Sequence, residues 1–121
     1  MITLCIPEAS PSLNRLTGKH WAYHHRLRRH WSMLILVAKN HANIGDWQAL
    51  EKAQVTVTRE GYKLLDTDNY FGGLKCLLDS LKDHHLIVDD SPDHLTLSAG
   101  QRRISRSEYP RTLIVIQTAK E

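Results

Sequence analysis

The segment LLDTDNYFGGLKCLLDSL, residues 64–81, combines an amphipathic helix pattern with a concentration of acidic side chains. Its leucines recur at three- and four-residue spacing, which predicts a helix over residues 69–83. The apolar face of this helix consists of Tyr70 or Phe71, Leu74, Leu77, Leu78 and Leu81. Such a face needs a surface to pack against, so the segment predicts a helical layer on a second layer of structure.

The flanking sequence supplies the remaining elements. Periodicity and turn residues predict strands over residues 2–6, 54–59, 86–88, 94–105 and 111–119, and a long helix over residues 19–42. This order predicts an α+β fold of two layers, in which a long N-terminal helix and a second, shorter helix cover a mixed β-sheet. The 121 residues contain no internal repeat and no linker, so we expect a single domain spanning residues 1–121.

Charge is distributed unevenly along the chain, whose formal net charge is +3. Residues 9–45 contain six cationic side chains and no acid, whereas residues 66–93 contain seven aspartates against two lysines. Cations again outnumber acids after residue 101. This basic, acidic, basic order favours a polyanion partner that binds the two flanks. Unrelated, solvated charged faces would account for the same composition.

Four aspartates in the acidic part are candidates for binding a metal ion. Asp66 and Asp68 are two residues apart, and in an extended segment both carboxylates would lie on one side, about 7 Å apart. Like charges this close need a cation or a proton between them. Asp89 and Asp90 follow a short apolar stretch. Carboxylate oxygens suit Mg²⁺, or Mn²⁺ as an alternative, so we expect a hard-metal site made by these four residues.

Lys75 is the candidate cationic group of this site. If the helix begins near Asp68, Lys75 stands about two turns above it and Asp79 one turn further, on the face opposite the leucines. A simpler interpretation makes Asp68 a helix N-cap and Lys75–Asp79 an exposed ion pair. That interpretation leaves Asp66, Asp89 and Asp90 without a role.

Two further features have alternative explanations. Gly72 and Gly73 are unfavourable inside a helix, so either the regular helix begins after them or another segment approaches their bare backbone. His20 and His24 are four residues apart and could bind zinc. No glutamate follows His20 as a metalloprotease motif requires, and no cysteine is near, so the zinc alternative is the weaker one.

Metal-binding carboxylates, a lysine and basic flanks together favour phosphodiester hydrolysis. Mg²⁺ would activate a water molecule and offset charge on the scissile phosphate, and Lys75 would stabilise the charge that develops on the phosphorane or the leaving oxygen. We expect a nucleic acid backbone to be bound by Asn14, Arg15, Lys19, Arg26, Arg29, Arg102 and Arg103.

Four segments in the same order resemble the RusA-like endodeoxyribonucleases, small dimeric Holliday-junction resolvases of bacteria and their phages. They are PSLNR (11–15), DTDN (66–69), LKCLLDSL (74–81) and VDDSPDHL (88–95). The resemblance implies that Asp66, Asp68 and Asp90 are the catalytic, metal-binding acids, that Asp89 supports them and that Lys75 is the catalytic lysine. It also implies a homodimer that nicks two strands of a four-way DNA junction symmetrically. The residues YFGGL place Lys75 about one helical turn further from DTDN than in the family's best-known member.

The remaining expectations concern partners and location. Residues 31–38 are apolar nearly all round the predicted helix, which favours a subunit contact there. The N-terminal residues predict a strand and no signal peptide, no apolar run approaches the ~20 residues of a membrane span, and the two cysteines form no disulfide framework. We therefore expect a cytoplasmic protein encoded by a bacterium or a phage. Two alternatives stay open: a non-catalytic protein that binds branched DNA, and a nuclease that acts on forks or flaps.

Overall fold

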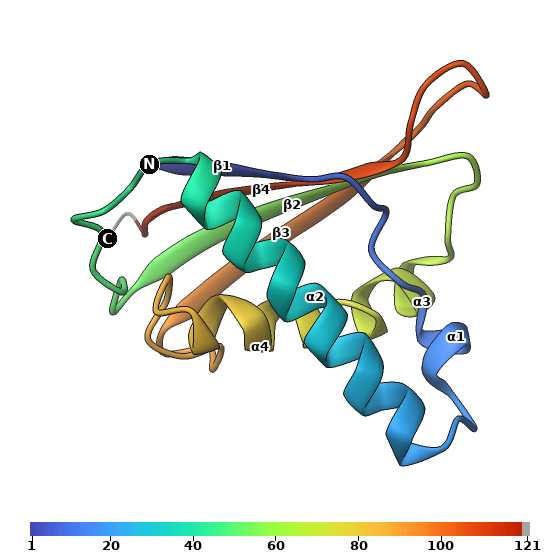
Figure 1. Cartoon of the computed structure of the whole chain (residues 1–121), viewed down its shortest axis with the longest axis horizontal. Helices are drawn as coiled ribbons and strands as arrows, with labels where there is room; N and C mark the ends of the chain where they lie inside the picture. The colour runs from blue at the N-terminus through green and yellow to red at the C-terminus, as the bar shows by residue number, and fades with distance from the viewer. Residues whose placement is uncertain (120–121) are drawn as a thin grey trace.

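A mixed four-stranded sheet forms one layer of the computed structural model, which describes residues 1–119, apart from the side chains of residues 15 and 16 (Figure 1). The elements are β1 (Ile2–Ile6), α1 (Leu13–Leu16), α2 (Trp21–His41), β2 (Ala53–Gly61), α3 (Thr67–Gly72), α4 (Lys75–Asp83), β3 (Leu95–Arg103) and β4 (Arg111–Thr118). The strand order is β1-β4-β2-β3; β4 runs antiparallel to both neighbours, and β3 runs parallel to β2. The predicted α+β fold with a mixed sheet is confirmed.

The core lies between the sheet and the helices α2 and α4, which cross the same face of the sheet in Figure 1. Alternate residues of β2, such as Val55 and Val57, point into it because side chains of a strand alternate between its faces. The apolar spacing of residues 19–42 predicts a stripe on α2 made of Leu27, Trp31, Leu34, Ile35, Ala38 and Ala42. Four of these are buried, and Leu34 and Ala42 are partly buried. No helix within residues 1–119 is both long and apolar enough to cross a bilayer.

Three local predictions are wrong. The helix expected over residues 69–83 is two helices, α3 and α4, separated at Gly73 and Leu74. The expected strand 86–88 is a single parallel bridge between Leu50 and Ile87, because only one residue of each segment pairs. The stretch PEASPSLNRLTGK (7–19), whose prolines, serines and Gly18 predict a loop, contains a four-residue helix, α1.

The glycine pair is explained by the close approach of the loop that precedes α1. A Cβ atom on Gly73 would lie 1.8 Å from the carbonyl oxygen of Pro11, and one on Gly72 would lie 2.7 Å from Cδ2 of Leu13. Both alternatives raised by the sequence therefore apply. The helix α4 begins after the two glycines, and another segment needs their bare backbone. Tight hydrogen bonds from Gly73 N to the Tyr70 oxygen and from Leu74 N to the Phe71 oxygen, both 3.1 Å, join the two helices.

We expect Gly73→Ala to lower the free energy of unfolding by about 3 kcal/mol, because the methyl group collides with backbone that cannot move aside without shifting the whole loop. Gly72→Ala should cost less, since the Leu13 side chain that it meets can rotate. Urea denaturation followed by circular dichroism measures both. Gly45→Ala is the control, because nothing lies within 4 Å of its Cβ position. A Gly73→Ala protein as stable as this control would contradict the predicted close approach.

Candidate functional site

The DTDN segment is anchored to β3 on both sides. Before it, Leu65 is held by the Gln101 side chain, whose Oε1 accepts from Leu65 N at 2.9 Å and whose Nε2 donates to Leu65 O at 2.8 Å. After it, the Tyr70 hydroxyl donates to the Gly100 and Val57 carbonyl oxygens at 2.7 and 3.3 Å. Burial raises the pKa of Tyr70 to about 12, so this hydroxyl keeps its proton and its donor role. The sheet therefore fixes where α3 begins.

Asp66 and Asp68 stand at the start of α3. Asp66 is the N-cap residue, in extended conformation, and Asp68 lies in the first helical turn. The expected extended arrangement of the pair is therefore wrong, because the helix begins between them. The simpler interpretation also changes, since Asp66 and not Asp68 holds the N-cap position. Asp66 makes no side-chain cap bond, both residues are exposed, and neither carboxylate forms an ion pair within the described chain. Both are accessible to a ligand.

Asn69, the last residue of DTDN, connects this segment to PSLNR. Its Oδ1 accepts a hydrogen bond from the main-chain N–H of Asn14 at 2.8 Å, across 55 residues of sequence. The Asn14 side chain takes no part in this bond and is exposed. Two of the segments that carry the family resemblance are thus in direct contact.

Lys75, the first residue of α4, joins the other two segments. Its Nζ lies 3.0 Å from Oδ1 of Asp79 and 3.0 Å from Oδ2 of Asp90. The hydrogen bonds to Asp90 and then to Asp79 raise the pKa of Lys75, so it is an ammonium ion at neutral pH. Lys75 is mostly exposed whereas both carboxylates are largely covered. The ammonium group therefore also faces solvent, where a substrate anion could approach it.

Asp89 and Asp90 are also held by Lys82. Its Nζ lies 3.7 Å from Oδ1 of Asp89 and 3.8 Å from Oδ1 of Asp90. The pKa of Asp89 is lowered, first by a hydrogen bond from the Ser91 side chain and then by the Asp90 backbone, so this carboxylate stays ionised. Both oxygens of Asp90 therefore face a lysine.

The expected metal-binding set is only partly assembled. Across residues 1–119, no three or more His, Cys, Asp or Glu side chains are grouped so that they could hold a metal ion. The structure brings Asp90 to Lys75, whereas Asp66 holds the N-cap position of α3 and Asp68 lies in its first turn. Their carboxylate oxygens are the donor type that fits Mg²⁺. At Asp90 a divalent ion would replace the lysine ammonium groups as counter-charge. His20, from the zinc alternative, caps α2 by accepting from Ala22 N at 3.2 Å.

A groove between α2 and α4 passes Lys75. One part, of about 110 Å³, is lined by His24, Arg28, Lys75 and Asp79; the next, of about 230 Å³, is lined by His25, Arg28, Arg29 and Asp79. Arg26 and Arg29 are exposed as expected. Sequence reasoning missed Arg28, which lines both parts. The signal was available, because Arg28 follows the buried Leu27 and so lies at the edge of the stripe that faces α4.

The other predicted DNA contacts are distributed differently. Arg102 Nε lies 2.6 Å from the buried carboxylate of Glu60, which Arg111 contacts as well. These residues alternate with the core-facing residues of their strands, so they lie on the sheet face away from the helices. Arg103 is exposed, Lys19 Nζ lies 5.5 Å from the centroid of the Tyr23 ring, and the Arg15 side chain is outside the described residues.

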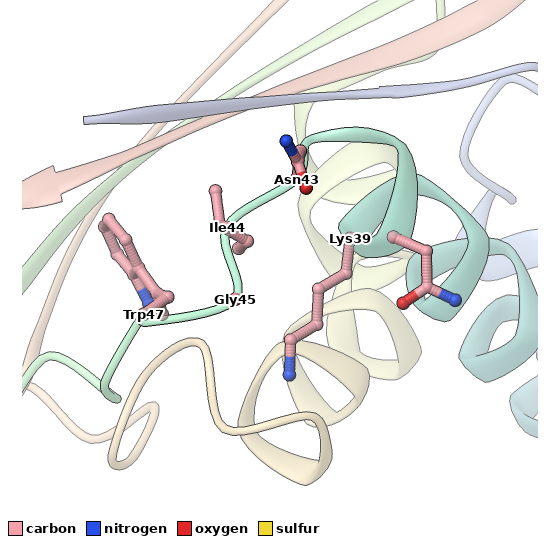
Figure 2. A pocket seen from close by; sticks show the side chains of 6 residues that line it. Lys39, Asn43, Ile44, Gly45 and Trp47 are labelled. Carbon is pink, nitrogen blue, oxygen red and sulfur yellow. The ribbon is translucent and has the colours of Figure 1, made fainter.

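A separate hollow of about 230 Å³ lies at the C-terminal end of α2, where Figure 2 shows Lys39, Asn43, Ile44, Gly45 and Trp47 around it. Its strongest donors are already engaged. Lys39 Nζ donates to the His84 carbonyl at 2.7 Å, and Trp47 Nε1 donates to the Leu86 carbonyl at 3.1 Å. These bonds tie α2 and the following loop to the end of α4, so the hollow has a structural explanation.

We expect Asn69→Ala to increase the hydrogen-exchange rate of the Asn14 amide about tenfold, because it removes the acceptor of that N–H. NMR-detected exchange measures the rate residue by residue. Asn14→Ala is the matched control, since it leaves the main-chain donor and the Asn69 acceptor in place. Equal protection of this amide in the wild type and in Asn69→Ala would contradict the contact.

Comparison with known proteins gives no assignment. No protein-family model matches this sequence, and no curated protein matches it. The functional conclusions therefore rest on the side chains and their contacts.

Proposed function

We propose that the protein is a Mg²⁺-dependent, structure-specific endodeoxyribonuclease of the RusA-like type, which resolves four-way DNA junctions by paired nicks. The observation that carries the proposal is the 3.0 Å contact between Lys75 Nζ and Asp90 Oδ2. This contact joins the segment LKCLLDSL (74–81) to VDDSPDHL (88–95). The hydrogen bond between Asn14 and Asn69 joins PSLNR (11–15) to DTDN (66–69). The four resembling segments are therefore in contact in two pairs.

In the proposed reaction each group has a distinct part. Asp66, Asp68 and Asp90 would hold Mg²⁺, with Asp89 beside them, and the bound ion would supply an activated water and offset phosphate charge. Lys75 is protonated at neutral pH whether or not Asp90 is bound to the ion, because the ordinary pKa of a lysine is already about 10.4. It can therefore donate a hydrogen bond to a phosphoryl or leaving-group oxygen as negative charge develops there.

The groove between α2 and α4 provides a path for the DNA backbone to Lys75. Arg28 lines it beside Lys75 and Asp79, and Arg29 lies in the adjoining part. Arg26 is exposed on the same helix. Cations on one helix next to the reacting groups are suited to binding phosphates without reading bases. We propose these arginines as the main non-specific DNA contacts, in place of Arg102, which is paired with Glu60.

We expect the protein to cut a synthetic four-way junction in the presence of Mg²⁺. Asp68→Asn and Asp90→Asn should each reduce cleavage more than 100-fold while leaving junction affinity within about threefold, because they remove metal ligands and not phosphate contacts. Gel electrophoresis of end-labelled strands measures cleavage, and gel shifts without Mg²⁺ measure binding. Asp46→Asn, an exposed aspartate in another loop, is the control.

The substrate comparison decides between the alternatives. A junction, a fork and a linear duplex at equal salt should be cut in that order of preference. Cutting of forks alone would assign the nuclease to another branched substrate. Binding of the junction without any cutting would favour the non-catalytic DNA-binding protein. Unchanged cleavage by both aspartate variants would contradict the proposed metal site.

We also propose a homodimer that uses the exposed apolar side of residues 31–38. Met33, Leu36 and Val37 are 65%, 43% and 47% exposed, whereas Trp31 and Ile35 are buried in the core. A pair of sites is what paired nicking requires.

We expect light scattering to give twice the chain mass of 13.9 kDa, and Leu36→Asp to return the single-chain mass, because a carboxylate would be buried in the contact. Tyr109→Asp, which changes an exposed aromatic in the β3–β4 connection, should leave the mass unchanged. A single-chain mass for the wild type would contradict the dimer.

A further inference from the structure

A cavity of about 400 Å³ lies between the β1–α1 connection and the residues that lead into α3. Its wall includes Ala9, Ser10, Pro11, Arg59, Leu65 and Pro110. Nothing in the proposed reaction uses this cavity. It is larger than either part of the groove beside Lys75.

Among the described residues that line the cavity, Arg59 is the only cationic one. Its Nε donates to the Ser10 carbonyl at 2.9 Å, and its Nη1 donates to the Lys63 carbonyl at 3.1 Å. Both acceptors are neutral, and no acid within the described residues forms an ion pair with it. Partial burial without a counter-charge lowers the pKa of Arg59, yet a guanidinium group keeps its proton. A charge in this state is stabilised by any anion that enters.

One other group of the wall supports an anionic ligand, and one carries a negative charge that is already paired. The Ser10 hydroxyl is enclosed and has no hydrogen-bond partner in the described structure, a state that costs about 1–3 kcal/mol. An oxyanion in the cavity would give it an acceptor. Glu8 also lines the cavity, but its carboxylate contacts His30 Nε2 at 2.5 Å, so its charge is directed to α2.

The cavity adjoins the acidic residues. Leu65 lines it and immediately precedes Asp66, and the Gln101 side chain holds Leu65 in place. A group bound by Arg59 would therefore lie next to the start of α3.

We propose that this cavity binds a phosphate group of the DNA strand, with Arg59 as its charged contact and the proline and leucine side chains against the attached nucleoside. The choice of DNA as the source of the phosphate rests on the proposed nuclease function. The cavity itself does not, because a free nucleotide or inorganic phosphate presents the same oxyanion.

The test uses a charge placed in the cavity wall. Ala9→Asp adds a carboxylate that repels a phosphate, and Ala9→Asn adds a group of the same size without charge. We expect Ala9→Asp to bind the junction about tenfold more weakly than Ala9→Asn in Mg²⁺-free buffer. The slope of log affinity against log salt concentration should also be shallower for Ala9→Asp, by the contribution of about one phosphate contact. Thermal melting should show that both variants are folded. Equal affinities of the two folded variants would overturn the proposal.

A second measurement separates this inference from the nuclease proposal. NMR titration of the wild type with a deoxynucleoside 5′-monophosphate, and separately with inorganic phosphate, should shift the Leu65 amide and the Arg59 Nε–H. Shifts with the nucleotide but no junction binding would support the cavity and contradict the nuclease. If the junction is cleaved but neither ligand shifts these NMR signals, and the two Ala9 variants bind the junction equally well, the phosphate site in the cavity is contradicted and the nuclease proposal is not. Shifts with inorganic phosphate only would assign the cavity to the free anion and overturn the DNA phosphate.

Discussion

The contact on which the candidate site depends is the close approach of Pro11 to Gly73. Because the Pro11 oxygen occupies the place of a Cβ atom, residue 73 must be glycine, and the helix that the leucines would otherwise continue is interrupted there. The interruption gives α3 and α4 separate starting points. As a result Asp66 and Asp68 begin one helix while Lys75 begins the next, and the loop with Asn14 is held against the first of them, α3.

The electrostatics around Lys75 explain how so many acids are tolerated in one region. Asp79 and Asp90 are largely covered and share one ammonium group at 3.0 Å, and Lys82 lies near Asp89 and Asp90. Opposite charges at these distances offset the repulsion between the carboxylates. The acids of α3 have no such partner in the described chain, so the two halves of the proposed metal site differ in their need for a cation.

Sequence reasoning predicted the parts of this structure that follow from periodicity. The stripe of α2, the alternation of β2 and the apolar face of α4 all depend on local spacing, and the structure confirms them. The break at Gly73 depends on a segment 60 residues away, so local spacing could show only that glycine was unusual there. The pairing of Arg102 with Glu60 and the facing of Arg28 toward α4 are likewise set by strand order and helix packing. Asp66 and Asp68 were identified by residue type, but their geometry depended on where the helix begins.

The two basic parts of the chain, in α2 and at the ends of β3 and β4, have different roles because they lie on opposite faces of the sheet. Cations of α2 lie on the helical side and line the groove that leads to Lys75. Those at the ends of β3 and β4 enclose Glu60 on the opposite face, where its pKa is lowered by hydrogen bonds from Arg111 and Arg102. A carboxylate buried in this way would be costly without both guanidinium groups, so their charge is used for folding. The arginines of α2 therefore lie on the helical side, the side on which the acids that would hold Mg²⁺ also lie.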